Sequence, residues 1–223
     1  MKSLKYILLL VLCQSAFMVF GQEAGYPFSA DIRHFKETDS INPPPQHAIL
    51  FAGSSSFTIW KDVQDYFPGY AIINRGFGGS TLADQIHYAS DIIFPYSPCQ
   101  VVIYCGENDL ASSDTVTEDM VLDRFTYLFN LIRARLPDAR ISYICMKPSP
   151  SRWHLAEKMT EANFNIRLFL EFQENADFVN VWDKMLDQDN LPDSSLFLED
   201  MLHMNAKGYA IWQKAIQPVL IKQ

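Results

Sequence analysis

The sequence predicts an α/β fold, a three-layer α/β/α sandwich with a central, mainly five-stranded parallel sheet. Short apolar runs alternate along the chain with longer segments whose apolar residues recur at helical spacing, which is typical of parallel strands joined by helical crossovers. The apolar runs are continuous, as in strands buried on both faces. No internal repeat or low-complexity segment interrupts this pattern, and 223 residues suffice for one domain with a sizeable core.

The expected strands and helices follow each other in regular order. The strands are expected at residues 49–52, 71–73, 101–105, 141–145 and, more weakly, 178–181. The helices are expected at residues 81–90, 117–136, 153–173 and 206–220, the last of them capped by Asn205. In the second helix the apolar residues fall on one face, which should belong to the core: Met120, Val121, Phe125, Leu128, Phe129, Ile132 and Leu136.

The N-terminus has the pattern of a secretory signal peptide over residues 1–21. Lys2 and Lys5 precede a largely apolar run at residues 6–20, and Gly21-Gln22 is the expected cleavage site. The run is short for a membrane span, which needs roughly 20 apolar residues, so a retained anchor is the less favoured alternative. We therefore expect a secreted or periplasmic protein with no stable membrane insertion after cleavage.

A polar strap and a single domain should follow the signal. Residues 22–46 contain one possible short helix, at residues 31–39, and end in three prolines that stop it. We interpret this segment as an N-terminal strap leading into the first strand. The remaining residues, 47–223, should form one domain.

The composition argues against several classes of partner. The net charge of the whole chain is −8, and removal of the signal takes away two lysines and no acid, which moves it to −10. An acidic surface disfavours nucleic acid and anionic membranes. Three cysteines remain, Cys99, Cys105 and Cys145. An odd number leaves at least one free thiol, and no disulfide framework is implied.

Neither a metal nor a cofactor is expected. The scattered histidines match no zinc-binding spacing: His34, His47, His87 and His154. The glycines at positions 76, 78 and 79 do not form the dinucleotide-binding pattern Gly-x-Gly-x-x-Gly, and no P-loop lysine follows them.

Polar and glycine-rich segments follow the first three expected strands directly, at residues 53–56, 76–81 and 106–109. Ligands of open parallel α/β sheets bind beyond the carboxyl ends of the strands, where all three segments should lie. A Gly-Ser turn into a helix can hold a hydroxyl clear of the sheet and direct backbone N–H groups at a developing negative charge. Each segment taken alone is also an ordinary strand-to-helix turn.

A fourth polar segment, Asp200-Met201-Leu202-His203, precedes the last expected helix. Histidine is the side chain best suited to general-base catalysis near neutral pH, and a carboxylate can hold its other ring nitrogen. The segment could therefore supply both groups. Read alone, it is equally a surface turn.

The four segments together resemble the SGNH hydrolases, also called GDSL-type lipases and esterases. The family's blocks correspond here to Gly53-Ser54-Ser55, Gly78-Gly79-Ser80-Thr81, Gly106-Glu107-Asn108-Asp109 and Asp200-Met201-Leu202-His203. The resemblance extends over residues 47–220 and implies the flavodoxin-like fold of this superfamily. One position departs from it, since the family usually has Asp where this chain has Ser54, as in a Gly-Ser-Ser sub-group.

The resemblance implies a serine esterase that forms an acyl-enzyme. Ser55 would be the nucleophile, favoured over its neighbouring serines by alignment on the preceding glycine. His203 would be the general base and Asp200 its partner. The backbone N–H groups of Ser55 and Gly79 and the side-chain amide of Asn108 would form the oxyanion hole. Asp109 is expected to brace this last loop.

The substrate is less closely defined. A small-molecule or carbohydrate ester, such as an O-acetylated sugar, is the preferred interpretation, with a lipid or lysophospholipid esterase as the alternative within enzymes. A non-catalytic carbohydrate-binding protein on the same scaffold is the alternative from another class, and the complete residue set counts against it.

The loop after the fourth strand, residues 147–153, should border the site by the same sheet-edge rule. Arg152 and Trp153 are candidates for substrate contact, Trp153 as an aromatic platform. The alternative for Trp153 is packing at the start of its helix.

Overall fold

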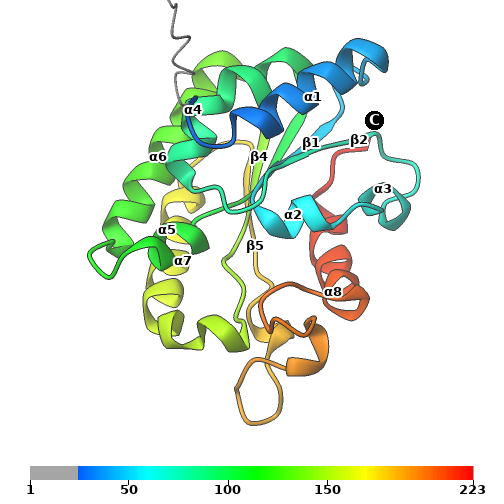
Figure 1. The fold of residues 1–223 in the computed structure, drawn as a ribbon. Coiled ribbons are helices and arrows are strands. Elements are labelled where there is room, and N and C mark those ends of the chain that lie inside the picture. The colour runs from blue at the N-terminus through cyan, green and yellow to red at the C-terminus, as the bar shows by residue number, and fades with distance from the viewer. Residues whose placement is uncertain (1–24, 223) are drawn as a thin grey trace, which may run out of the picture.

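The computed structural model describes residues 25–222, so the predicted signal peptide lies outside the described residues. Five strands form one parallel sheet in the order β2-β1-β3-β4-β5, and helices cover both faces (Figure 1). The predicted three-layer α/β/α fold is confirmed. The strands are β1 Ile49–Gly53, β2 Ile72–Gly76, β3 Gln100–Tyr104, β4 Arg140–Ile144 and β5 Ala176–Val179.

Strand β1 shows why the central strands are continuous apolar runs. All five of its residues are buried. Successive side chains point to opposite faces of a sheet. Leu50 and Ala52 accordingly pack into one core, and Ile49 and Phe51 pack into the other. A strand with a core on each side has no polar face, and its sequence does not alternate.

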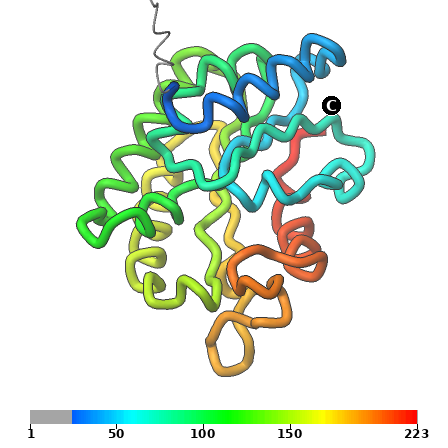
Figure 2. Tube along the Cα trace, viewed as in Figure 1, coloured from blue at the N-terminus to red at the C-terminus, as the bar shows by residue number. Residues whose placement is uncertain are grey.

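The helices divide between the two cores. One side carries α1 Ser29–Ile41, α4 Leu82–Ile92, α5 Glu107–Ser112, α6 Glu118–Arg135 and α7 Ala156–Glu171. The other side carries α2 Ser55–Ile59, α3 Val63–Tyr66 and α8 Ala206–Ile216. Figure 2 follows the orange segment between β5 and α8, which projects from the body of the molecule before the chain returns. Within residues 25–222, no helix has the length and apolar character needed to cross a bilayer.

Several elements differ from their predicted bounds, among them β2, β5, α7 and α8, which ends at Ile216 and not at residue 220. Strand β5 spans Ala176–Val179 and not residues 178–181, because this whole segment pairs with β4. The helix predicted at residues 153–173 begins at Ala156, since the 3₁₀ turn Pro150–Leu155 precedes it. The predicted cap of the last helix is confirmed, because the Asn205 side chain accepts hydrogen bonds from the first turn of α8.

The strand order places a crevice beside β1. From β1 the chain passes to β2 on one side and then crosses to β3 on the other. At such a switch point the two following loops diverge and leave room for a ligand at the carboxyl ends of the strands. At this end Gly53 of β1 pairs with Tyr104 of β3 and with Gly76 of β2. The three loops after these strands therefore begin at the same position along the strand direction, at the same edge of the sheet.

Helix α1 lies across α4 on the outside of the first core (Figures 1 and 2). Its residue Ile32 is buried in that core. Near its end, Asp39 forms an ion pair with Arg75 of β2 and accepts a hydrogen bond from the Tyr96 hydroxyl at 2.6 Å. These contacts join the predicted strap to the sheet.

Candidate active site

The turn after β1 distinguishes its three serines. Gly53 approaches β3 so closely that a Cβ there would lie 2.1 Å from the carbonyl oxygen of Tyr104, so only glycine fits. Ser54 and Ser56 are buried, whereas Ser55, the first residue of α2, is half-buried. Among the three, the Ser55 hydroxyl is therefore the one open to a substrate.

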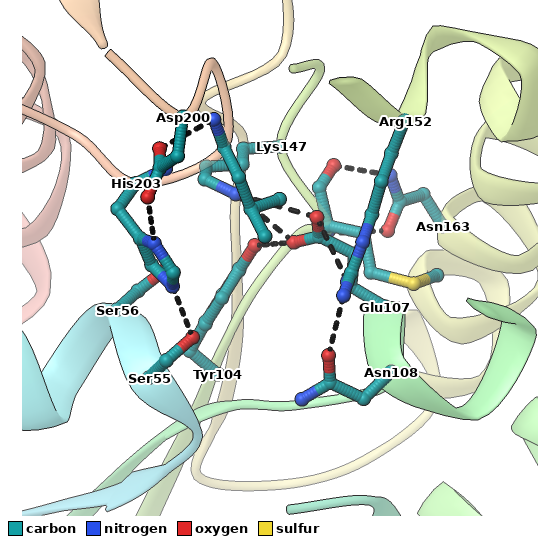
Figure 3. Close-up of polar contacts among 12 residues, drawn as sticks. Ser55, Ser56, Tyr104, Glu107, Asn108, Lys147, Arg152, Asn163, Asp200 and His203 are labelled. Carbon is teal, nitrogen blue, oxygen red and sulfur yellow. Dashed lines mark hydrogen bonds and ion pairs between the residues drawn. The ribbon is translucent and has the colours of Figure 1, made fainter. Parts of the chain in front are cut away.

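Ser55, His203 and Asp200 form a chain of hydrogen bonds (Figure 3). The Oγ atom of Ser55 lies 2.9 Å from Nε2 of His203, although the two residues are 148 positions apart. The Nδ1 atom of His203 lies 2.6 Å from Oδ2 of Asp200. The structure thus brings together the three side chains that the sequence predicts as nucleophile, general base and the carboxylate partner of that base.

The carboxylate fixes the roles of the two ring nitrogens. The other oxygen of Asp200 accepts the backbone N–H groups of Leu202 and His203, each at 2.9 Å. Burial by itself would raise the pKa of Asp200, but these bonds and the imidazole outweigh it and lower the pKa to about 2. An ionised carboxylate only accepts, so Nδ1 carries a hydrogen, and when the ring carries no second proton Nε2 accepts the hydroxyl hydrogen of Ser55.

Three N–H donors are assigned to the oxyanion hole by the family resemblance. Among the described residues, the backbone N–H groups of Ser55 and Gly79 have no acceptor. Gly79 has a φ of +86°, in the left-handed region that glycine adopts without strain. The side-chain nitrogen of Asn108 donates one hydrogen to the carbonyl oxygen of Ser80 at 2.9 Å, which leaves its second hydrogen available. Figure 3 shows this nitrogen on the Ser55 side of the amide.

Buried side chains hold the second and third loops against the first. The Gln85 side chain donates to the carbonyl oxygen of Gly53 at 3.1 Å and to the Ser80 hydroxyl at 2.9 Å. Asp109 accepts the backbone N–H of Leu82 at 2.9 Å and Arg124 at 2.7 Å. Burial raises the pKa of Asp109 in spite of these donors. These contacts fit the bracing role that the sequence predicts for Asp109.

A buried charged network that the sequence did not reveal lies behind Asn108. The carboxylate of Glu107 lies 3.1 Å from Nζ of Lys147 and 3.2 Å from Nη1 of Arg152. It also accepts the Tyr104 hydroxyl at 2.5 Å. Glu107 occupies the variable position of the Gly-x-Asn-Asp block, so the motif gives no signal for it. Lys147 lies in the loop that was expected to border the site, without a predicted role.

Opposing effects set the pKa values in this network. Burial would raise the pKa of Glu107, but Lys147, Arg152 and the Tyr104 hydroxyl outweigh it, so the pKa is lowered. Burial lowers the pKa of Lys147, and Glu107 only partly restores it. Burial and the nearby Glu107 carboxylate raise the pKa of Tyr104 well above its usual value, so its hydroxyl stays neutral. One carboxylate is thus shared between two cations.

The two candidate substrate residues have different surroundings. The guanidinium of Arg152 contacts the side chains of Asn108 and Glu107, so its contacts in this structure are with other protein side chains. Trp153 is half-buried, and its ring lies 6.0 Å from that of Trp182 in a stacked arrangement. Trp182 also borders a surface hollow of about 200 Å³ that contains none of the candidate catalytic residues. Trp153 thus packs against a residue that is distant in the sequence and lies in the segment after β5.

The model of the GDSL-like Lipase/Acylhydrolase family matches residues 49–211, most of the chain. The chain belongs to this family. The match includes the nucleophile turn and the Asp200–His203 segment, and confirms the SGNH resemblance. Membership makes the protein a hydrolase of the esterase class. A search of curated proteins found no match.

Solved structures resemble this acylhydrolase in fold. A Streptococcus pneumonia protein named for platelet activating factor has a TM-score of 0.75 at 19% identity, over 86% of this chain and 92% of its own. A GDSL-like lipase from Bacteroides thetaiotaomicron has a TM-score of 0.73 at 21% identity, over 85% and 97%. A catalytic mutant of an acetylxylan esterase from Geobacillus stearothermophilus has a TM-score of 0.63 at 15% identity, over 79% and 95%. At these identities the likeness shows a shared fold.

Proposed function

We propose that this acylhydrolase cleaves carboxylic esters through a Ser55–His203–Asp200 triad and a covalent acyl-enzyme. The observation that carries the proposal is the unbroken chain of contacts, 2.9 Å from Ser55 Oγ to His203 Nε2 and 2.6 Å from His203 Nδ1 to Asp200 Oδ2. Contacts of this length put nucleophile and base within reach of proton transfer.

In the first half-reaction, Ser55 Oγ attacks the ester carbonyl carbon while its proton passes to Nε2 of His203. The resulting imidazolium lies beside Asp200, which stays ionised because its pKa is about 2. The carbonyl oxygen becomes an oxyanion that accepts N–H groups from Ser55, Gly79 and Asn108. Loss of one such donor costs about 10²–10³ in rate in other serine hydrolases.

Collapse of the tetrahedral intermediate breaks the bond to the alcohol. His203 gives its proton to the departing alcohol oxygen, and the acyl group stays on Ser55. In the second half-reaction His203 takes a proton from water, which attacks the acyl-enzyme. The proton then returns to Ser55 as the carboxylic acid leaves.

For the substrate we propose acetyl groups on carbohydrate. The stacked pair Trp153–Trp182 supports this choice, since aromatic rings are suitable platforms for sugar faces. The acidic composition disfavours anionic lipid surfaces. The likeness to an acetylxylan esterase points the same way. Turnover of acetylated xylo-oligosaccharides should exceed that of lysophospholipids, and the reverse order would favour the lipid alternative.

We also propose that residues 1–21 direct export and are removed, that residues 22–46 form the strap, and that residues 47–223 form the hydrolase domain. Expression in a bacterium followed by mass spectrometry of the exported protein tests the cleavage. A mature N-terminus near Gln22 is expected. An exported chain that retains Met1 would contradict the signal assignment.

The triad is tested by hydrolysis of a short aryl ester. Ser55→Ala and His203→Ala should each lower kcat by at least about 10³-fold, because nucleophile and base act as one unit. Ser151→Ala is the matched control, since Ser151 is an exposed serine on a neighbouring loop, and it should be close to wild type. Near-wild-type turnover by Ser55→Ala would refute the assignment.

A further inference from the structure

Arg152 lies between the candidate oxyanion donor and the buried carboxylate behind it (Figure 3). Its Nη2 atom donates to Oδ1 of Asn108 at 2.9 Å, and its Nη1 atom lies 3.2 Å from Oε1 of Glu107. Glu107 and Asn108 are adjacent in the first turn of α5. One planar guanidinium therefore engages two consecutive side chains.

We infer that Arg152 is a positioning residue that fixes the orientation of the Asn108 amide, so that nitrogen and not oxygen faces the oxyanion. The inference rests on the proposed function of Asn108. In this role Arg152 acts on the reaction through Asn108.

The hydrogen-bond pattern admits one orientation of the amide. A guanidinium has only donors, so the atom facing Arg152 must be the acceptor Oδ1. On the other edge, Nδ2 donates to the carbonyl oxygen of Ser80, which is only an acceptor. Rotation of the Asn108 amide by 180° would set donor against donor and acceptor against acceptor. It would also present a lone pair to the developing negative charge.

The rest of the network holds the guanidinium in place. Glu107 is fixed by Lys147 and by the Tyr104 hydroxyl, and the Lys147 and Glu107 side chains are 1% and 5% exposed. The Glu107 carboxylate thus lies in contact with both Arg152 and Lys147. A cation at Oδ1 also polarises the amide and strengthens its N–H groups as donors.

A double-mutant cycle tests the inference. Arg152→Ala should lower kcat for a short aryl ester about 10-fold or more with KM within about twofold, a part of the cost of losing a whole oxyanion donor. In an Asn108→Ala background the same substitution should change kcat less than about twofold, since the group it positions is gone. Arg167→Ala is the control, because Arg167 is exposed on α7 and its nearest ion-pair contact is with Glu171 at 3.8 Å.

Arg152→Lys keeps the charge but not the planar fork, and serves if the alanine variant does not fold. It should lose part of kcat in the wild-type background and none in the Asn108→Ala background. Equal losses in both backgrounds, or a loss confined to KM, would overturn the inference and assign Arg152 to direct contact with substrate. Failure of the proposed function has a different signature, because Asn108→Ala would then match wild type.

Discussion

Both carboxylate oxygens of Asp200 accept hydrogen bonds from the segment Asp200–His203. One holds the imidazole of His203, and the other caps the backbone of the residues leading to it. A three-residue spacing is thus enough to orient the base, without a carboxylate from a distant strand. Met201 between them has a φ of +55°, so the turn closes through a left-handed residue.

Asp200→Asn should reverse the tautomer of His203. An asparagine nitrogen would donate to Nδ1, which would move the ring hydrogen to Nε2 and leave no acceptor for the Ser55 hydroxyl. By analogy with other triads, kcat should fall by about 10²–10⁴ at pH 7. The measurement is single-turnover hydrolysis, and a loss below about threefold would contradict the role.

The same substitution should change how stability depends on pH. The pKa of Asp200 is lower folded, about 2, than unfolded, about 3.9, so the unfolded chain binds more protons between these values. The stabilisation is therefore present above pH 4 and lost as the pH falls toward 2. Denaturant unfolding of wild type and Asp200→Asn should differ most near pH 6, and the difference should shrink as the pH falls from about 4 toward 2. A constant difference over this range would exclude the linkage.

The loops after β1, β2 and β3 function as one unit. Gly53 accepts hydrogen bonds from Ser80 and Gln85, and the Ser80 carbonyl accepts from Asn108. The first block thus positions the second and the second positions the third. Helix α5 adds the buried carboxylate of Glu107, to which the loop after β4 is tied through Lys147 and Arg152.

Removal of the Glu107 charge should destabilise the contact between α5 and the loop after β4. Glu107→Gln leaves the buried ammonium of Lys147 without its carboxylate, and breaking a buried pair costs about 3–5 kcal/mol. The pKa of folded Lys147 is lowered by burial even beside Glu107, and loss of that carboxylate should lower it further. The variant then releases this proton at a lower pH than wild type does. The loss of stability should therefore shrink as the pH rises through the interval between the two folded pKa values, as measured by urea unfolding.

Lys147→Met in the Glu107→Gln background is the control for this prediction. It removes the unpaired cation and should recover part of the lost unfolding free energy at pH 7. A double variant less stable than Glu107→Gln at every pH would show that the ammonium is not the source of the cost.

At the scale of the whole molecule, the strap contributes to the core of the enzyme. Ile32 of α1 is 3% exposed and packs with α4, whereas Ile41 on the same helix is 77% exposed. Ile32→Ala should lower the free energy of unfolding by about 2–5 kcal/mol, the usual cost of such a core truncation. Ile41→Ala, the same change at an exposed site, should be near neutral. Equal stability of the two variants in chemical denaturation would show that α1 is not part of the cooperative unit.

The sequence predicts the sheet well because burial on both faces gives each central strand an unambiguous apolar run, as in β1. It predicts Asp200 and His203 as triad candidates because they are only three residues apart. It predicts Ser55 because the serine follows the glycine of the family's first block. Glu107 and Lys147 were missed because they are 40 positions apart and meet only once β3 and β4 are paired. The bounds of β5 were missed for a similar reason, since pairing with β4 and not local composition sets them.

Covalent labelling by a fluorophosphonate, with the labelled residue identified by mass spectrometry, tests directly whether Ser55 is the nucleophile. One label per chain is expected, on Ser55, and it should be absent from Ser55→Ala and strongly slowed in His203→Ala and Asn108→Ala. A label on Ser54 or Ser56, or no label on protein that hydrolyses esters, would contradict the assignment of Ser55.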